Sequence, residues 1–163
     1  MRYNRAKLVV LILILLLFTP TRVKGGGRSH CLGMDIIRLI DKAQYDGMFN
    51  LFYQGSLSPN TALVLGYSSG DTTRIIDIDY KIYSSRYLNS IFFQVGGVYI
   101  DENIDDDEED SDIGFKATLG YEHSPIQHIV FSGAVKCTTG IRNPVTGDED
   151  PYYQPMLSLI IGF

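Results

Sequence analysis

The sequence predicts an all-β chain: an eight-stranded antiparallel up-and-down transmembrane β-barrel that follows an N-terminal signal peptide. Three observations lead to this prediction. A short apolar segment follows a basic start, apolar and polar residues alternate with period two along the rest of the chain, and the last alternating segment reaches the final residue. The 163 residues are enough for one domain.

Residues 1–25 have the composition of a secretory signal peptide. Arg2, Arg5 and Lys7 precede an unbroken apolar run at 8–18. A helix of that length spans about 16 Å, which is too short for a bilayer core of about 30 Å. We therefore expect a cleaved leader at 1–25 and a mature domain at 26–163.

The basic leader offsets half of the net negative charge of the mature chain. The whole sequence carries −5, but the leader holds five basic residues and no acidic ones, so the mature chain carries −10. Such an acidic chain lacks the basic face that nucleic-acid binding requires, and we expect no nucleic-acid partner.

Period-two alternation predicts each strand in turn. At 75–82, the apolar Ile76, Ile78, Tyr80 and Ile82 alternate with Asp77, Asp79 and Lys81. The other segments that alternate lie at 33–42, 47–57, 61–69, 91–99, 113–122, 126–137 and 155–163. An even number of such segments is typical of an outer-membrane barrel with both termini in the periplasm.

The connections also alternate in length. Short turns are expected at 58–60, 84–87 and 123–125, and longer segments at 101–112 and 138–154. Short turns on one rim and longer loops on the other are the layout of outer-membrane barrels.

Charged and polar residues occupy the face opposite the apolar one. The set predicted to line the interior is Arg38, Asp77, Asp79, Lys81, Gln94, Lys116, Glu122 and Lys136. Charges of both signs cannot fill a dry core, but they can pair in a barrel lumen while the apolar face contacts lipid. The alternative is a secreted or periplasmic soluble β-barrel that binds a small ligand, with these residues on its solvent face.

The last strand and the strand pair at 47–70 carry a family resemblance. Leu157, Leu159, Ile161 and Phe163 alternate to the end of the chain. The pair contains the runs Phe49-Asn50-Leu51-Phe52-Tyr53, Ser56-Leu57-Ser58-Pro59-Asn60 and Leu63-Val64-Leu65-Gly66-Tyr67. These segments resemble the small outer-membrane β-barrels of the OmpA-like, OmpX-like and opacity-protein kind. The resemblance implies their fold, an outer-membrane location, and recognition of the last strand by the barrel-assembly machinery. It transfers no catalytic residue.

The segment at 101–112 is the candidate cation site, because nine of its twelve residues are acidic. Its possible ligands are Asp101, Asn103, Asp105, Asp107, Glu109, Asp110 and Asp112. The order of residues does not match an EF-hand, since an aspartate occupies the glycine position. We expect a solvated loop that is disordered without cations and binds Ca²⁺ or Mg²⁺ weakly, and no other cofactor.

Two further patterns concern catalysis and a disulfide. A lipid A-modifying enzyme ranks lowest among the functions, because the adjacent His123 and Ser124 would face opposite sides of a strand while His128 and Ser132 share the face assigned to the lumen. We therefore expect no enzyme. Cys31 and Cys137 are expected at opposite rims, some 25 Å apart, which is too far for a disulfide.

These expectations combine into one function. The chain is predicted to be a monomer in the outer membrane of a Gram-negative bacterium, with a lumen too full for an open pore. It would have a structural or surface-interaction role, in envelope integrity, adhesion or cation-dependent contact with lipopolysaccharide.

Overall fold

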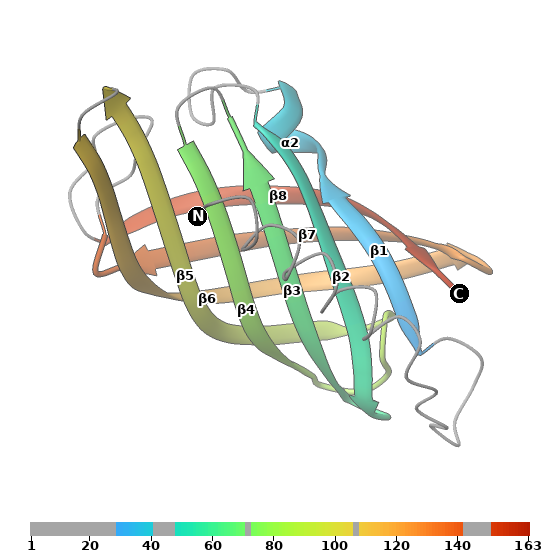
Figure 1. Cartoon of the computed structure of the whole chain (residues 1–163). Coiled ribbons are helices and arrows are strands. Elements are labelled where there is room, and N and C mark those ends of the chain that lie inside the picture. The colour runs from blue at the N-terminus through green and yellow to red at the C-terminus, as the bar shows by residue number, and fades with distance from the viewer. Residues whose placement is uncertain (1–28, 41–47, 71–72, 106–107, 142–150) are drawn as a thin grey trace.

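The computed structural model describes residues 29–40, 48–70, 73–105, 108–141 and 151–163, and within these the side chains of 102–110 are not described. Eight antiparallel strands form one closed barrel in chain order (Figure 1). The strands are β1 (His30–Asp35), β2 (Phe49–Ser58), β3 (Thr61–Ser69), β4 (Thr73–Tyr83), β5 (Ile91–Asp105), β6 (Glu108–Ile126), β7 (Ile129–Thr139) and β8 (Tyr152–Gly162). The predicted all-β, eight-stranded barrel is confirmed.

The apolar face of the strands points outward. On β4, Asp77, Asp79 and Lys81 are buried, while Ile78 and Tyr80 are 56% and 42% exposed. The exposed large apolar residues of the wall include Leu51, Tyr67, Ile82, Ile91, Phe93, Val95, Tyr99, Ile113, Phe115, Leu119, Tyr121, Phe131, Val135, Tyr153, Leu157, Ile161 and Phe163. Soluble monomers rarely expose so extensive an apolar surface, since burial of such side chains is what normally drives folding.

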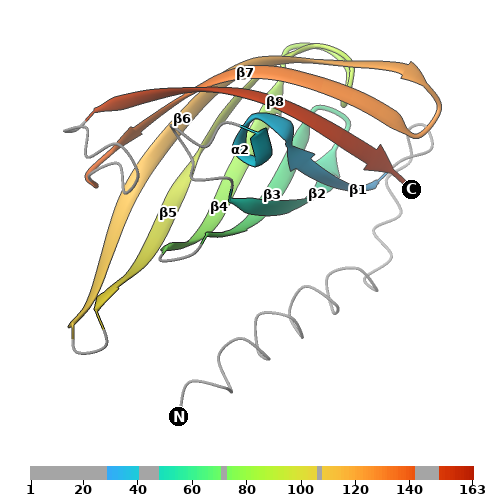
Figure 2. The same cartoon turned by 90° about the horizontal axis from the view of Figure 1, so that it is seen from above.

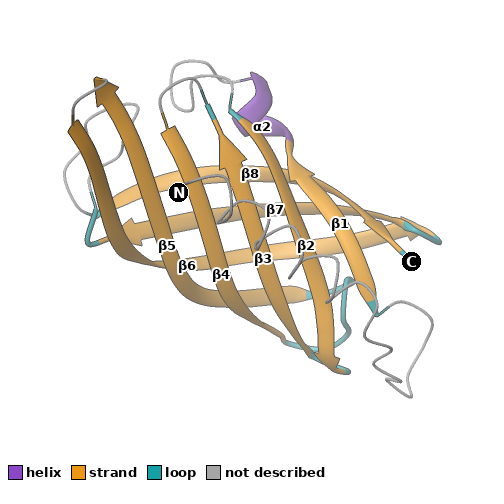
Figure 3. Ribbon diagram, in the orientation of Figure 1, coloured by secondary structure: helices purple, strands orange, loops and turns teal. Residues whose placement is uncertain are grey.

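Both ends of the barrel sequence lie at one rim, which we call the terminal rim. There β1 begins beside the end of β8, with Cys31 opposite Gly162, as Figure 1 also shows. The turns β2–β3, β4–β5 and β6–β7 lie at the same rim. At the opposite rim, which we call the distal rim, α2, β3, β5 and β7 end and β2, β4, β6 and β8 begin (Figure 3).

The expected first strand at 33–42 is wrong in its second half. β1 ends at Asp35, and Ile36–Ile40 form a short helix, α2. The side chain of Asp35 caps this helix, because its Oδ1 accepts a hydrogen bond from the backbone N–H of Ile37 at 3.1 Å, as an N-cap residue does. Among the described residues, no helix is long and apolar enough to cross a membrane.

Since β1 is short, α2 completes the wall near the distal rim. β1 pairs with β8 only as far as Asp35 opposite Ser158, and with β2 only from His30 to Gly33. Beyond that point α2 contacts both β8 and β2. Figure 2 shows α2 between β8 and the strands on the other side of this seam.

The expectation of an acidic loop at 101–112 is also wrong for most of its backbone. β5 continues to Asp105 and β6 begins at Glu108, so the segment forms a hairpin that extends the ladder of the barrel. The base of this acidic hairpin is supported by β4, where Arg74 lies opposite Asp101. An opposite-charge pair at that position favours the extension.

The turn expected at 123–125 lies farther along the chain. β6 continues to Ile126, and a register shift between His123 and Ile126 accommodates Pro125, which cannot donate a ladder hydrogen bond. The two cysteines lie at different levels of the wall. Cys31 is buried at the terminal rim, Cys137 lies near the distal end of β7, and no disulfide joins them.

Candidate functional site in the barrel lumen

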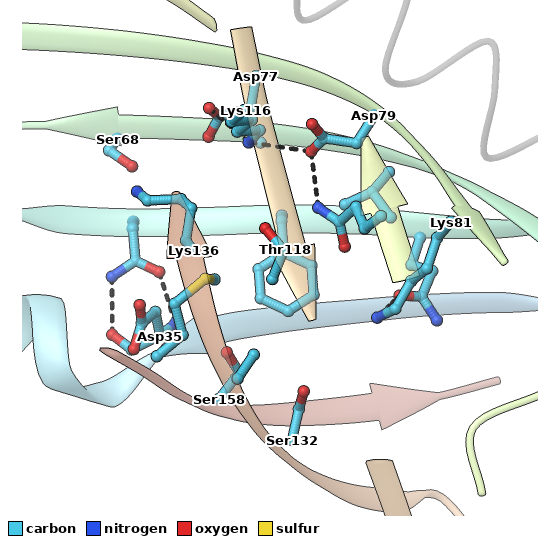
Figure 4. A pocket seen from close by; sticks show the side chains of 18 of the residues that line it. Asp35, Ser68, Asp77, Asp79, Lys81, Lys116, Thr118, Ser132, Lys136 and Ser158 are labelled. Carbon is cyan, nitrogen blue, oxygen red and sulfur yellow. Dashed lines mark hydrogen bonds and ion pairs between the residues drawn. The ribbon is translucent and has the colours of Figure 1, made fainter. Parts of the chain in front are cut away.

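The lumen has three layers. An apolar distal layer is formed by Met48, Ile75, Val98, Ile100, Ile141 and Tyr152. Two apolar clusters close the terminal end, and their buried members are Cys31, Ala62, Tyr83, Leu88, Phe92, Val130 and Ile160. Between these layers lies a polar belt around a cavity of about 50 Å³ (Figure 4). That volume holds a few water molecules and is far smaller than a channel.

Lys81 and Glu122 form the ion pair nearest the terminal end, and both side chains are almost completely buried. Lys81 Nζ also donates to Gln54 Oε1 at 3.0 Å. Tyr83 connects the same groups, since its hydroxyl donates to Glu122 Oε2 at 2.6 Å and accepts from Gln54 Nε2 at 2.7 Å. The ammonium lies 3.8 Å from the centre of the Phe92 ring, which favours the cation further. The network therefore satisfies both charges within the protein.

The terminal plug below this network comes from the β4–β5 turn. Leu88 is buried there although its backbone adopts a left-handed conformation with φ of 63°, which is unusual for a bulky residue. The Tyr87 hydroxyl lies 3.7 Å from Sγ of Cys31, and burial raises the pKa of Tyr87. This turn seals the terminal end of the lumen.

Lys116 bridges two carboxylates on the neighbouring side of the belt. Its Nζ lies 2.7 Å from Asp77 Oδ1 and 2.9 Å from Asp79 Oδ2. Gln94 donates from Nε2 to the same Asp79 oxygen at 2.9 Å. Figure 4 shows this group beside the cavity. One cation thus serves two anions, and the Lys116 side of the lumen has an excess of one negative charge.

Arg38 enters the belt from α2. It donates to the Ser68 hydroxyl, and its Nε lies 3.9 Å from Asp35 Oδ2. Asp35 is fixed in turn by Asn50, whose side chain exchanges two hydrogen bonds with the Asp35 backbone. The helix therefore brings a charged side chain into the lumen from the seam between β8 and β2.

Lys136 projects from β7 into the same cavity and is only 6% exposed. Its cross-strand neighbours are the uncharged Thr118 and Gln154. Within the described part of the chain, Lys136 forms no ion pair and no hydrogen bond. In Figure 4 its side chain carries no dashed line.

All eight residues predicted to line the lumen are brought together around this cavity, although Arg38 comes from a helix and not from a strand. The cation site is different. Asp101 and Asp112 lie on paired strands, Asp107 lies outside the described residues, and the side chains of Asn103, Asp105, Glu109 and Asp110 are outside the described part. Among the described residues, no group of three or more side chains could hold a metal ion.

Sequence reasoning missed Asp35, Asn50, Gln54 and Tyr83. Asn50 and Gln54 occupy alternate positions of β2 that share the inner face, so the period-two pattern itself contained that signal. Asp35 before an apolar run has the form of an N-cap signal. Tyr83 has no such signal, because an aromatic at a strand end suits a membrane interface equally well.

The remaining predicted groups lie apart from the belt or at its margin. His128 lies in the β6–β7 turn with φ of 103°, and its Nδ1 is 2.8 Å from the carbonyl oxygen of Gly162. Ser132 lines the cavity and is buried. On β8, Leu157, Ile161 and Phe163 are exposed on the outer wall, and Leu159 is half-buried.

Comparison with known proteins identifies the fold. No family model matches the chain. No curated protein matches it either. The crystal structure of the N-terminal β-barrel domain of Pseudomonas aeruginosa OprF matches with a TM-score of 0.62 and 10% sequence identity, over 85% of this chain and 100% of that one. The chain therefore has the eight-stranded barrel fold of that domain.

Proposed function

We propose that the protein is a small, monomeric outer-membrane β-barrel of a Gram-negative bacterium with a structural or surface-interaction role and no open pore. The observation that carries the proposal is the reversed polarity of the fold. Isoleucine, leucine and aromatic side chains cover the outer wall, and four buried carboxylates and four buried basic groups lie inside. Lipid, not water, is the solvent that suits this wall, and a soluble ligand-binding barrel requires the opposite arrangement. The likeness in fold to an OprF domain supports the same location.

The position of the termini supports one orientation. With the terminal rim in the periplasm, the acidic hairpin at 101–112 extends from the cell surface. Such a surface attracts divalent cations that also neutralise the phosphates of lipopolysaccharide. Envelope integrity or adhesion through a cation-dependent contact with lipopolysaccharide is the role that this charge favours.

The interior supports a non-conducting barrel. The cavity of about 50 Å³ lies between apolar layers at both ends, and ion pairs cross the polar belt between them. A conducting path would have to break these pairs and wet both apolar layers, which is costly. We expect the purified barrel in planar bilayers to give no stable conductance.

The outer face of β8 supports recognition by the barrel-assembly machinery. Leu157, Ile161 and Phe163 present an apolar row on the outer wall of the barrel. We expect Phe163→Ala to reduce the amount of assembled barrel in cells, whereas Tyr153→Ala, on the same face of β8 but at its other end, reduces it less. Equal yields of both variants would contradict recognition of the last strand.

Cell fractionation tests the proposal as a whole. We expect the mature chain in the outer-membrane fraction, with its migration on SDS gels changed by heating, since a folded barrel resists SDS until boiled. A soluble product in the periplasm that migrates identically with and without heating would overturn the proposal. That result would favour a soluble ligand-binding barrel.

A further inference from the structure

We infer that the outer wall binds the lipid A part of lipopolysaccharide near the distal rim, with a phosphate at Arg74 and one acyl chain in a depression at Gly97. The inference rests on the proposed function, because the distal rim then lies in the outer leaflet, where lipopolysaccharide is found. It deepens the proposed contact with lipopolysaccharide by assigning that contact to particular residues of the wall.

Arg74 lies at the boundary between the apolar wall and the acidic hairpin. It is exposed on the outer face of β4, and among the described residues it forms no ion pair, although Asp101 lies opposite it on β5. Its neighbour on β3 is the uncharged Ser69. A guanidinium in this position can bind a phosphate through two parallel hydrogen bonds, a geometry that arginine provides and lysine does not.

Two tyrosines lie one step below Arg74 on the neighbouring strands. Ile76 pairs with Tyr67 on β3 and with Tyr99 on β5, and these tyrosines are 38% and 37% exposed on the outer wall. Their Cα atoms are about 10 Å apart, which is twice the distance between neighbouring strands. Tyrosine is favoured at a membrane interface, because its ring is apolar and its hydroxyl bonds to headgroups. The two tyrosines and Arg74 therefore form a triangle of hydrogen-bond donors at the level of the headgroups.

A depression in the wall lies below this triangle, at Gly97 on β5. A Cβ at Gly97 would meet only the carbonyl oxygen of Gly114, at 3.9 Å, so the space outside this residue is open. The cross-strand neighbours Ile78 and Phe115 are 56% and 68% exposed, and they project on both sides of the missing side chain. An acyl chain that fills the depression gains dispersion contacts with both of them.

A second outward glycine shows which depression suits a phosphorylated lipid. Gly133 on β7 also has no atom within 4 Å of the position that its Cβ would occupy. The outward residues between Gly133 and the distal end of β7 are Val135, Cys137 and Thr139, and none of them is basic. A lipid that carries a phosphate is held at both its headgroup and its chain only where a basic residue lies above the depression. Gly97 meets this condition and Gly133 does not.

The acidic hairpin acts on the same headgroup through cations. Lipid A carries two phosphates, and Arg74 binds one of them. The second phosphate requires another cation, and the hairpin at 101–112 attracts divalent cations from solution. Direct binding by Arg74 and the cation-dependent contact are therefore complementary.

Titration of the complete mature barrel with lipid A tests the headgroup end of the site. The protein is folded in detergent micelles with magnesium present, and binding is followed through the amide NMR signals. We expect saturable shifts centred on Arg74, Gly97 and Tyr99. Arg74→Gln should weaken binding at least about tenfold, because it removes hydrogen bonds to a charged group. Arg86→Gln, which removes an exposed charge at the terminal rim, is the matched control and should bind as the wild-type protein does.

Gly97→Val tests the acyl-chain end of the site. The substitution fills the depression, and we expect weaker binding of lipid A by a barrel that still folds, because a Cβ at this position meets no close atom. Gly133→Val is the matched control and should keep the affinity of the wild-type protein. Heat-modifiable migration shows that each variant is folded.

The lipid itself is varied in the last arm of the test. Lipid A without its phosphates should bind equally to the wild-type protein and to Arg74→Gln. The inference is overturned if Arg74→Gln binds intact lipid A as tightly as the wild-type protein does, or if removal of the phosphates leaves the affinity unchanged. Equally tight binding of phosphatidylglycerol would also overturn it and would assign this surface to phospholipids. Because the titration uses purified protein, its failure is distinct from a failure of the proposed location, which cell fractionation decides.

Discussion

On the β2 side, the backbone of Asp35 on β1 forms its hydrogen bonds with the side chain of Asn50 and not with the backbone of β2. Asn50 Oδ1 accepts from the backbone N–H of Asp35 at 2.6 Å, and Asn50 Nδ2 donates to the Asp35 carbonyl at 2.9 Å. A side chain also bonds to the backbone on the β8 side of the seam, where Asp35 Oδ1 accepts a hydrogen bond from the N–H of Leu157 at 3.1 Å. Side chains thus continue the hydrogen-bond ladder at the residue where β1 becomes α2.

Asn50→Leu tests how much these side-chain hydrogen bonds contribute to stability. The variant leaves the buried N–H and C=O of Asp35 without their partners, and we expect a loss of about 1–3 kcal/mol in the free energy of unfolding. Urea unfolding in micelles measures the loss. Asn60→Ala, in the exposed β2–β3 turn, is the control and should change the free energy by less than about 0.5 kcal/mol. Equal effects of the two substitutions would show that the seam does not depend on Asn50.

The pair of Lys81 and Glu122 gives a second prediction. Lys81→Met leaves Glu122 charged and completely buried, and we expect a loss of about 3–5 kcal/mol. Lys81→Met combined with Glu122→Gln removes both charges and should recover most of that loss. A double-mutant cycle built on urea midpoints gives the coupling energy. A double variant as unstable as the sum of the single ones would mean that the two groups act independently.

Gly96 gives a third prediction, because Asp79 is directly opposite on β4. A Cβ at position 96 would lie 2.1 Å from Asp79 Oδ1 and 2.2 Å from the Ile78 carbonyl oxygen. The second of these atoms belongs to the backbone and cannot rotate away. We expect Gly96→Ala to cost at least about 3 kcal/mol or to prevent folding.

Gly133 is the matched control for this substitution. It also lies within a strand, but no atom is within 4 Å of the position that its Cβ would occupy. Gly133→Ala should therefore be neutral or slightly stabilising. Heat-modifiable migration shows whether each variant folds. Normal folding of both would refute the close approach at Gly96.

The acidic hairpin gives a fourth prediction. The register places Glu102 opposite Asp110, and like charges in opposite positions destabilise a strand pair. We expect the amide hydrogens of these two residues to exchange more slowly in about 1 M sodium chloride, where the Debye length is about 3 Å, than at low salt. The amide of Val95, within the barrel wall, serves as the control.

Calcium distinguishes weak screening from a specific site in the same experiment. If the hairpin only attracts cations, calcium and sodium at equal ionic strength should slow exchange with no saturation below about a millimolar. Saturation at lower concentrations, absent when Glu102, Glu109 and Asp110 are replaced by amides, would instead establish a specific cation site.

The inward and outward positions of the wall could be predicted from the sequence because a strand has a period of two and its two faces meet different environments. Asp77, Asp79 and Lys81 show this: each lies in the lumen as the alternation of β4 indicates. The position of the polar belt along the barrel could not be predicted. Ile75 and Ile100 share the inner face with the charged residues, and they form part of an apolar layer because the register places them opposite each other.

The two incorrect predictions, the strand at 33–42 and the loop at 101–112, have local physical causes. The segment Ile36–Ile40 suits a strand in composition, but it forms a helix that the carboxylate of Asp35 caps. The acidic segment suits a loop by charge, but hydrogen bonds continue from the barrel into its backbone. In both cases the relevant hydrogen bonds begin at the edge of the segment, and the apolar and charged pattern within the segment does not report them.

The brevity of β1 has a consequence for how the barrel opens and closes. The ring is joined by its shortest strand, which pairs with β8 only between Cys31 and Asp35 and with β2 only between His30 and Gly33, whereas the other neighbouring strands pair along most of their length. Free energy of local opening is lowest where the fewest hydrogen bonds must break together. We therefore expect β1 with α2 to be the first part of the barrel to open and the last part to pair during folding.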